Sequence, residues 1–173
     1  MSDNQRVIVA GSGLAAAATA RAIALAGLEV ALIDERAAVS GTAGDETDWY
    51  SSWWPSGDEP LARFAEAGID RLEAVHTESG GAFAFGRGGQ LFVSRRPEVI
   101  AALRSATGKY AALDTGQLRE HATADWYLPS PREGFTGVPE GFDILEGHAL
   151  KAVFPFLGQG AQVGFHVRRA GLI

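Results

Sequence analysis

A glycine-rich turn and an acid near the amino terminus have the residue types and the spacing for binding a nucleotide. A Gly-Ser-Gly turn at residues 11–13 follows an apolar run, Ala16 is a third small residue, and Asp34 closes a second apolar run. Gly11 permits a sharp turn, and Gly13 lets the backbone approach a pyrophosphate. The Asp34 carboxylate can accept hydrogen bonds from both ribose hydroxyls and would repel the 2′-phosphate of NADP. The pattern therefore predicts a site for an adenosine diphosphate group with a free ribose.

Two strands and a helix must hold these residues in place. Residues 7–10 and 30–33 are apolar runs of strand length, and the Ala-rich segment between them is typical of a helix that Gly27 ends as a left-handed cap. The N–H groups at the start of that helix would face an anion, which the helix dipole also favours. An Ala-rich core helix after a glycine turn, without a ligand, is the alternative. A signal peptide is not expected, because glycines interrupt the apolar run and Arg21 lies inside it.

Composition excludes several other kinds of function. The 173 residues are 46% hydrophobic and carry a net charge of −6, with no basic cluster, which argues against a nucleic-acid or anionic-membrane partner. No apolar run approaches the roughly 20 residues that a membrane span needs. Cysteine is absent, which removes disulfides and thiolate chemistry and is compatible with the cytoplasm. The histidines are isolated, so no metal site is predicted, and no nucleophile elbow or P-loop is present.

Periodicity and turn residues predict the elements of the remaining chain. We expect a long helix over residues 58–79 with an apolar face in the core, and a β-hairpin over residues 83–93. The further expected elements are a helix from residue 96, a short strand at 111–113, a helical turn ending at His121, an ordered loop over 122–141, a helix over 142–153 and a strand over 161–167. His76 is expected to be structural. Residues 35–57 either run along a cofactor with their aromatic side chains walling a pocket or an interface, or place their tryptophans in the core.

The chain resembles a known family in several of these segments. The first is VIVAGSGLAAAATARAIALAGLEVALIDER, followed by the helix that ends in HTESG, the segment AFAFGRGGQLFVSRRPE and the closing run GFHVRRAGLI. Together they resemble flavin-dependent oxidoreductases of the D-amino-acid oxidase type, which include sarcosine and glycine oxidases and amino-acid dehydrogenases. The likeness extends over essentially the whole chain but over only the first half of the family's length. It implies an α/β fold: a Rossmann-like FAD-binding domain, incomplete and spanning residues 1–80, followed by the beginning of a mixed-sheet substrate domain at 81–173.

The resemblance also implies FAD as the cofactor and assigns residues to it. The segment under the pyrophosphate would comprise Gly11, Ser12, Gly13, Leu14 and Ala15. Asp34 and Glu35 would lie near the adenosine ribose, Arg36 beside the adenosine, and Thr42, Ala43 and Gly44 along the flavin. Many relatives carry a histidine or arginine in the loop equivalent to residues 40–47, sometimes bonded covalently to the flavin. This chain has neither there, so we expect non-covalent FAD.

The family's later segments have no counterpart in this chain. The resemblance therefore predicts a complementary polypeptide that supplies the rest of both domains, either as a separate subunit or as the other half of a cut chain. The predicted activity is oxidation of an amine or amino acid at a C–N bond by hydride transfer to flavin. Arg87, Arg95 and Tyr110 are candidates for holding a substrate carboxylate, with ordinary surface arginines as the alternative, and no catalytic residue is assigned. A non-catalytic scaffold subunit is the second hypothesis, while a small NAD-binding protein is disfavoured because regular strand–helix alternation stops after residue 35.

Overall fold

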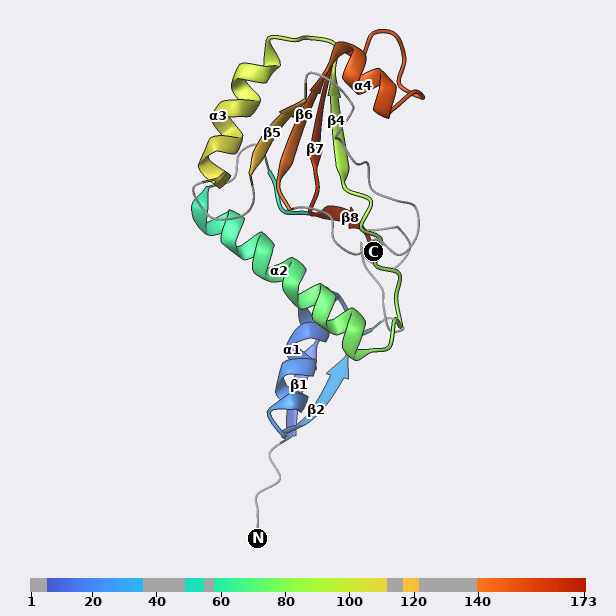
Figure 1. The fold of residues 1–173 in the computed structure, drawn as a ribbon. Helices are drawn as coiled ribbons and strands as arrows, with labels where there is room; N and C mark the ends of the chain where they lie inside the picture. The colour runs from blue at the N-terminus through green and yellow to red at the C-terminus, as the bar shows by residue number, and fades with distance from the viewer. Residues whose placement is uncertain (1–5, 36–48, 55–57, 112–116, 122–139) are drawn as a thin grey trace. The chain divides into compact units, whose positions relative to one another are not determined.

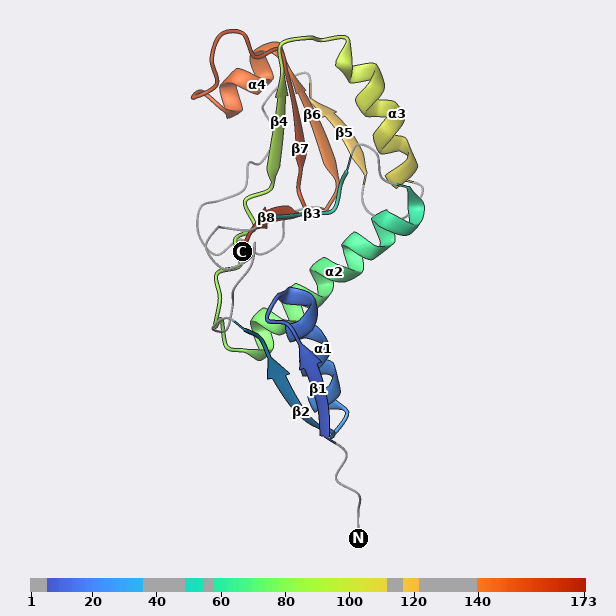
Figure 2. The same ribbon diagram turned by 180° about the vertical axis from the view of Figure 1, so that it is seen from behind.

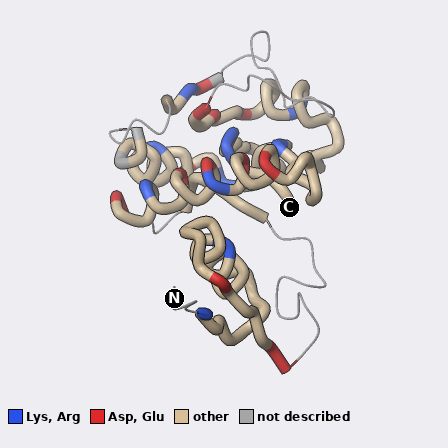
Figure 3. Tube along the Cα trace, turned by 90° about the horizontal axis from the view of Figure 1, so that it is seen from below, with Lys and Arg blue, Asp and Glu red and all other residues tan. Residues whose placement is uncertain are grey.

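The structure is a computed structural model that describes residues 6–35, 49–54, 58–111, 117–121 and 140–173. The chain forms two compact units, residues 1–48 and 49–173, and each is described by itself. Both combine helices with sheet, which confirms the predicted α/β class. Acidic and basic residues are interspersed along the described elements (Figure 3).

The first unit is a strand–helix–strand motif, as predicted (Figure 1). β1 (Arg6–Ala10) and β2 (Glu29–Ile33) pair in parallel, with Arg6 opposite Glu29 and Ala10 opposite Ile33. Helix α1 (Leu14–Leu25) connects them, and Gly27 follows it with φ +81°, a conformation that favours glycine. Because the strands are parallel and in register, their carboxyl ends lie at one edge of the motif.

The second unit contains a four-stranded mixed sheet in the order β4-β7-β6-β5 (Figure 2). Its strands are β4 (Gln90–Ser94), β5 (Leu118–His121), β6 (Phe142–Glu146) and β7 (Val163–Val167). β5 and β6 are parallel, while β7 is antiparallel to both β6 and β4. A separate ribbon pairs β3 (Trp49–Ser51) with β8 (Ala170–Leu172) in antiparallel fashion.

Three helices accompany these strands: α2 (Glu59–Glu78), α3 (Val99–Ala111) and α4 (Gly147–Val153). α2 was predicted to within a residue at each end because its boundary signals are local. The Asp58 carboxylate accepts a hydrogen bond from Leu61 N at 3.1 Å, and Pro60 lies in the first turn. Gly80 and Gly81, both with positive φ, follow its carboxyl end.

Several predicted elements were wrong. Residues 83–93 do not form a hairpin, because β4 pairs with β7 and Gly86 forms a bridge with Leu172 of β8. The expected helix over 142–153 is a strand, β6, followed at Gly147 by the short helix α4. The expected helical turn before His121 is strand β5, and α3 extends to Ala111 where a strand was predicted. In each case apart from α3, pairing with a strand distant in sequence determines the structure. The predicted loop at 122–141 lies almost wholly outside the described residues.

Helices pack on both faces of the sheet of the second unit. Phe142, Ile144 and Phe165 are buried on one face with Trp53, Ile100 and Tyr110, and side chains of α3 pack against this cluster. Leu145 and Leu150 form a second buried cluster, which lies on the α4 side. The predicted alternation in β7, with Val163, Phe165 and Val167 on one face and His166 on the other, agrees with these clusters.

The aromatic and apolar residues near α2 only partly follow the prediction. Trp53 is 3% exposed and packs edge-on against Phe92 and Phe165, so this tryptophan is core. Trp49 and Trp54 instead stack on one another and are about half exposed. On α2, whose apolar face was expected in the core, Ile69 is buried but Phe64 is 77% exposed. The buried side of α2 runs through Ala62 and Ile69 and includes the half-buried Glu66, so it coincides only in part with the expected apolar face.

A row of polar residues crosses the other face of the sheet. Arg119 of β5 is opposite Asp143 of β6, and Asp143 is opposite His166 of β7. Both oxygens of the Asp143 carboxylate bond to Arg119, at 2.8 and 3.1 Å, and Oδ2 also accepts from Arg168 Nε at 2.5 Å. Asp143, His166 and Arg168 are at most 4% exposed. A buried charge without a partner destabilises the folded state, so this cluster favours the observed arrangement of β5, β6 and the end of β7.

We expect stability to fall in mild acid because of His166. Burial, and secondarily the charge of Arg168, lowers the pKa of His166 from 6.5 to about 4, whereas Asp143 and the Gly88 backbone oppose the shift. As pH falls from about 6.5, the unfolded chain binds this proton before the folded chain does. The free energy of unfolding should therefore decrease, by about 3 kcal/mol in total, until the pH reaches the folded pKa. Urea unfolding between pH 7 and 5 measures the slope. The His166→Gln variant should lose this pH dependence. A wild-type free energy of unfolding that does not change between pH 7 and 5 would contradict the lowered pKa of His166.

Candidate cofactor-binding site

The carboxyl ends of β1 and β2 form the edge on which the candidate site is built. Gly11 N donates a hydrogen bond of 2.7 Å to Ile33 O, which holds the turn after β1 against the end of β2. Gly11 has φ +115°, and this conformation explains why glycine is needed there. Ala10, Gly11, Ile33, Asp34 and Glu35 line an open hollow of about 540 Å³ at this edge.

The amino end of α1 begins at the same turn. Gly13 is the N-cap, with extended backbone at φ −71° and ψ 171°, and no side chain caps the helix. The first turn of α1 contains no acidic residue. A Cβ built on Gly13 would meet nothing within 4 Å, so the side of the backbone where a side chain would project is open. Main-chain N–H groups and the positive end of the helix dipole are therefore available to a phosphate group.

Asp34 follows β2 and is linked to the turn after β1. Ser12 Oγ donates a hydrogen bond of 2.9 Å to Asp34 Oδ2, and both Asp34 and Glu35 are exposed. An exposed carboxylate next to an uncapped helix start combines an acceptor for hydroxyl groups with donors for an anion. This combination fits the two ends of an adenosine diphosphate group: ribose and pyrophosphate.

Most of the residues predicted for this site lie together. The structure brings to one edge of the first unit Gly11, Ser12, Gly13, Leu14, Ala15, Asp34 and Glu35. The other predicted residues, Arg36, Thr42, Ala43 and Gly44, lie outside the described residues. Sequence reasoning placed Ser12 under the pyrophosphate and missed its bond to Asp34. The parallel register of β1 and β2 was the signal that could have revealed it, because residues that follow the carboxyl ends of neighbouring parallel strands lie close together.

The residues considered for a substrate carboxylate have structural contacts in the second unit. Tyr110 is 3% exposed, and its hydroxyl donates to Trp54 O at 2.8 Å. Arg87 pairs with Glu73 of α2 at 3.2 Å and lies over the ring of Phe85. A Cβ on Gly160 would lie 3.2 Å from Arg95 Nε, so Arg95 passes close to that turn. No two of these three side chains form a common site in the contacts of the described residues.

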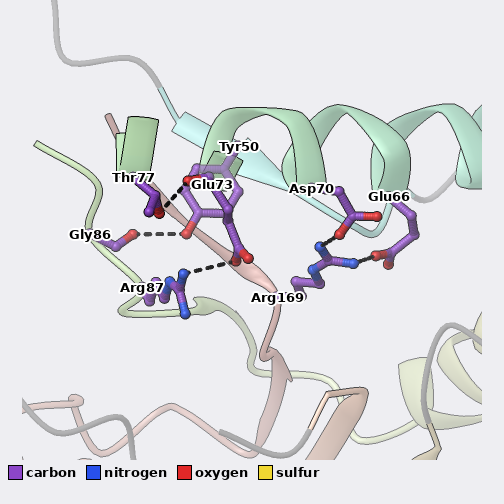
Figure 4. A network of polar contacts seen from close by, with 8 residues as sticks. All are labelled: Tyr50, Glu66, Asp70, Glu73, Thr77, Gly86, Arg87 and Arg169. Carbon is purple, nitrogen blue, oxygen red and sulfur yellow. Dashed lines mark hydrogen bonds and ion pairs between the residues drawn. The ribbon is translucent and has the colours of Figure 1, made fainter. Parts of the chain in front are cut away.

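Polar contacts instead join α2 to the β3–β8 ribbon and the segment beside it (Figure 4). Arg169, just before β8, bonds to both Glu66 and Asp70 of α2. Tyr50 of β3 donates a hydrogen bond to Gly86 O at 3.1 Å. Burial raises the pKa of Glu66, and the Arg169 charge opposes that shift. His76 Nδ1 lies 3.0 Å from Phe83 O, in keeping with the structural role expected for this histidine.

Comparison with known proteins identifies the family. The family model described as FAD dependent oxidoreductase matches residues 6–173, almost the entire chain. The chain belongs to this family of FAD-dependent oxidoreductases. Membership implies FAD binding, and the geometry at the ends of β1 and β2 suits the adenosine diphosphate part of that cofactor.

Solved structures show the same fold in longer proteins. Glycine oxidase from Bacillus cereus has a TM-score of 0.63 and 14% identity; the similarity covers 98% of this chain and 39% of that one. L-proline dehydrogenase from P. horikoshii has a TM-score of 0.64 and 15% identity, with 99% of this chain and 38% of that one covered. This chain therefore spans less than two-fifths of either protein. A search of curated proteins finds no match. Among the described residues, no helix combines the length and hydropathy that crossing a membrane requires.

Proposed function

We propose that this FAD-dependent oxidoreductase chain is the FAD-binding half or subunit of an enzyme that oxidises an amine or amino acid. The observation that carries the proposal is the uncapped start of α1 beside the Ser12–Asp34 pair. In the proposed site, the N–H groups of the first turn of α1 bind the pyrophosphate, and Asp34 accepts hydrogen bonds from the ribose. FAD, when bound, supplies the acceptor for a hydride from a C–N bond. The fold neighbours named for glycine and proline support an amino-acid or amine substrate.

The cofactor is proposed to be non-covalent, because residues 40–47 contain neither histidine nor arginine. Acid precipitation of the purified protein distinguishes the two modes: non-covalent FAD stays in the supernatant, and covalent flavin sediments with the protein. We also propose that residues 1–80 belong to the FAD-binding domain and residues 81–173 to the substrate domain. A cytoplasmic location is proposed from the absence of cysteine.

A complementary polypeptide is proposed to complete both domains. The 38–39% coverage of the two fold neighbours supports this, since their remaining length has no counterpart here. Exposed apolar side chains in the first unit also support it: Ile8, Leu14, Leu25 and Ile33 are between 53% and 70% exposed. Parallel sheets are normally covered on both faces, so a two-stranded one with such side chains suits further packing. Size-exclusion chromatography with light scattering tests whether the chain requires a partner. A stable 18.2 kDa monomer that retains FAD would contradict it.

Replacing Asp34 tests the cofactor site directly. We expect Asp34→Ala to weaken FAD binding roughly 10- to 100-fold, because a hydrogen bond to a charged group contributes about 1.5–3 kcal/mol. Titration of the full chain, with any co-purifying chain present, measures this through flavin fluorescence. Glu29→Ala is the matched control: it removes an acid from the opposite end of β2, where Glu29 pairs with Arg6, and should leave FAD affinity unchanged. Equal FAD affinity in wild type and Asp34→Ala would refute the assigned site.

The second candidate function is a scaffold subunit that binds the nucleotide but carries no chemistry. The structural contacts of Tyr110 and Arg87 favour it, since neither side chain is placed as a substrate ligand. The Asp34→Ala variant separates the two functions. Loss of both bound FAD and turnover in this variant supports the enzyme function. Altered assembly, with turnover by the partner unchanged, supports the scaffold function.

A further inference from the structure

The sheet of the second unit ends at β4, and one edge of this strand is open. In the order β4-β7-β6-β5, β7 is the only strand of the described residues that pairs with β4. The sequence of β4, QLFVS, contains neither a charged residue nor a proline, which are the residues that commonly protect an exposed edge. An apolar edge without such protection is a template on which a further strand can pair.

The main-chain groups on the open edge belong to Leu91 and Val93. Ser94 O accepts a hydrogen bond of 2.9 Å from Gln162 N, which directly precedes β7, so the main-chain groups of Ser94 point toward β7. In a strand, the main-chain groups of neighbouring residues point to opposite edges. Those of Phe92 therefore also point toward β7, whereas the N–H and C=O groups of Leu91 and Val93 point away from it. These groups are placed to bond to a strand added beside β4.

An apolar groove of about 580 Å³ lies next to this edge, on the face of the sheet that α3 covers in part. Phe92, Val93 and Ser94 of β4 line it, together with Trp53 and side chains of α3 and β7. Every second side chain of a strand beside β4 would project on the same face as Phe92 and could reach this groove. The edge and the groove therefore suit one occupant, a strand with apolar residues at alternate positions.

The charges beside β4 are positive. Residues 79–97 include three arginines and no acid. Arg87, before β4, pairs with Glu73 at 3.2 Å. Arg95 and Arg96, after β4, are exposed and form no ion pair with a described residue. A second copy of this chain, paired antiparallel on β4, would bring these two arginines of each copy toward Arg87 of the other, and like charges disfavour that pairing. A strand with a carboxylate at this position is favoured instead.

We propose that β4 is the strand on which the complementary polypeptide docks. That polypeptide adds an apolar strand along Leu91 and Val93, fills the groove with alternate side chains, and places a carboxylate beside Arg95 and Arg96. The inference rests on the proposed function, because it names the surface for the partner proposed there. The two fold neighbours match this chain over 38–39% of their length, and the rest of each is long enough to supply such a strand. Strand addition gains affinity from main-chain hydrogen bonds and specificity from alternate side chains.

Amide hydrogen exchange tests the docking surface. The full chain is purified from its own cells together with the polypeptide that accompanies it. Exchange is measured in this complex and in the chain after the two are separated, and the FAD content of both samples is measured by absorbance. We expect the Leu91 and Val93 amides to exchange roughly tenfold or more slowly in the complex, because each N–H then donates to the added strand.

A proline variant removes one donor from the open edge. Val93→Pro takes away an N–H that points away from β7, and proline is tolerated at such positions of an edge strand. We expect it to bind the polypeptide roughly 10- to 100-fold more weakly, since an acceptor on the added strand loses its donor. Val93→Thr keeps the N–H and the branched side chain and should bind as the wild type does. Wild-type affinity in a folded Val93→Pro chain would overturn the docking at β4.

A charge variant leaves the strand itself unchanged. We expect Arg96→Gln to bind the polypeptide roughly two- to fivefold more weakly at low ionic strength, with the difference shrinking as salt is added. Arg63→Gln is the matched control, because it removes an exposed arginine from α2, and it should bind as the wild type does. Equal affinities of Arg96→Gln and wild type at low salt would overturn the proposed carboxylate contact.

The outcomes separate the docking surface from the function on which it rests. A complex that holds FAD but leaves the exchange of Leu91 and Val93 unchanged overturns docking at β4 alone. A complex that protects both amides but takes up no FAD overturns the cofactor proposal and supports the docking surface. A homodimer in which both amides are protected overturns the choice of occupant. A chain that stays an 18.2 kDa monomer overturns the partner and its docking surface together.

Discussion

Replacing Asp143 with alanine is expected to lower the free energy of unfolding by about 3–5 kcal/mol. The Asp143 side chain is fully buried, and its carboxylate binds both Arg119 and Arg168. Arg168 is itself 3% exposed at its side chain, so removal of Asp143 takes away the charge that balances a buried guanidinium. Arg119 also donates to Glu140 O at 3.0 Å, which ties β5 to the residues leading into β6. Urea unfolding at pH 7 measures the change.

The matched control for Asp143 is an exposed ion pair on the neighbouring strand, β5. Glu120 accepts from Arg104 of α3 at 2.5 and 2.6 Å, and both side chains are more than 40% exposed. Exposed pairs are well solvated when broken, so Glu120→Ala should change stability little. The comparison isolates burial, since each acid pairs with arginine. If Asp143→Ala lowers the free energy of unfolding as little as Glu120→Ala does, the buried cluster does not hold the sheet together.

The first motif and α2 could be predicted from the sequence because their determinants are local. Gly11, Gly27 and Asp34 mark the turn, the helix end and the strand end of a motif whose two strands pair with each other. Asp58 and Pro60 similarly mark the start of α2 through contacts within one helical turn. A local signal of this kind needs no knowledge of the rest of the fold.

The central sheet could not be predicted in the same way. Residues 142–146 are a short segment of three apolar and two acidic residues whose spacing suits a helix or a strand, and the pairing of β6 with β7 and β5 decides between them. Likewise, Gly86 forms a bridge with Leu172, far along the chain, rather than with nearby β4. Such pairings depend on tertiary packing, which overrides local propensity.

The candidate site was predictable to the level of residues but not of bonds. The spacing of Gly11, Gly13 and Asp34 predicted positions for a phosphate and a ribose, and the structure places these residues at one edge. The hydrogen bond from Ser12 to Asp34 required the register of β1 against β2. The charged cluster around Asp143 could not be predicted, because Arg119, Asp143 and Arg168 come from separate segments that the completed sheet brings together.

Replacing Gly13 with valine is expected to weaken FAD binding about 10- to 100-fold while the protein stays folded. The backbone at Gly13 is extended, so any residue can adopt it, and a built Cβ finds no atom within 4 Å. Within the protein the larger side chain therefore has room, and we expect a stability change of about 1 kcal/mol or less. The branched side chain would instead project into the space proposed for the pyrophosphate, where overpacking costs about 1–3 kcal/mol. Flavin fluorescence titration and urea unfolding measure the two effects.

Gly11→Ala should have the opposite effect, because it should lower the stability of the fold and not act directly on FAD binding. The built Cβ lies 3.5 Å from Ala16 Cβ, an ordinary contact, but φ is +115°, so the cost is backbone strain of about 1–3 kcal/mol. Gly11→Ala should therefore destabilise the first unit, whereas Gly13→Val should reduce binding without that loss. If Gly13→Val binds FAD as the wild type does, the pyrophosphate does not approach the backbone at this turn. The two glycines would then serve only the fold of the motif, as the interpretation of this segment as a helix without a ligand requires.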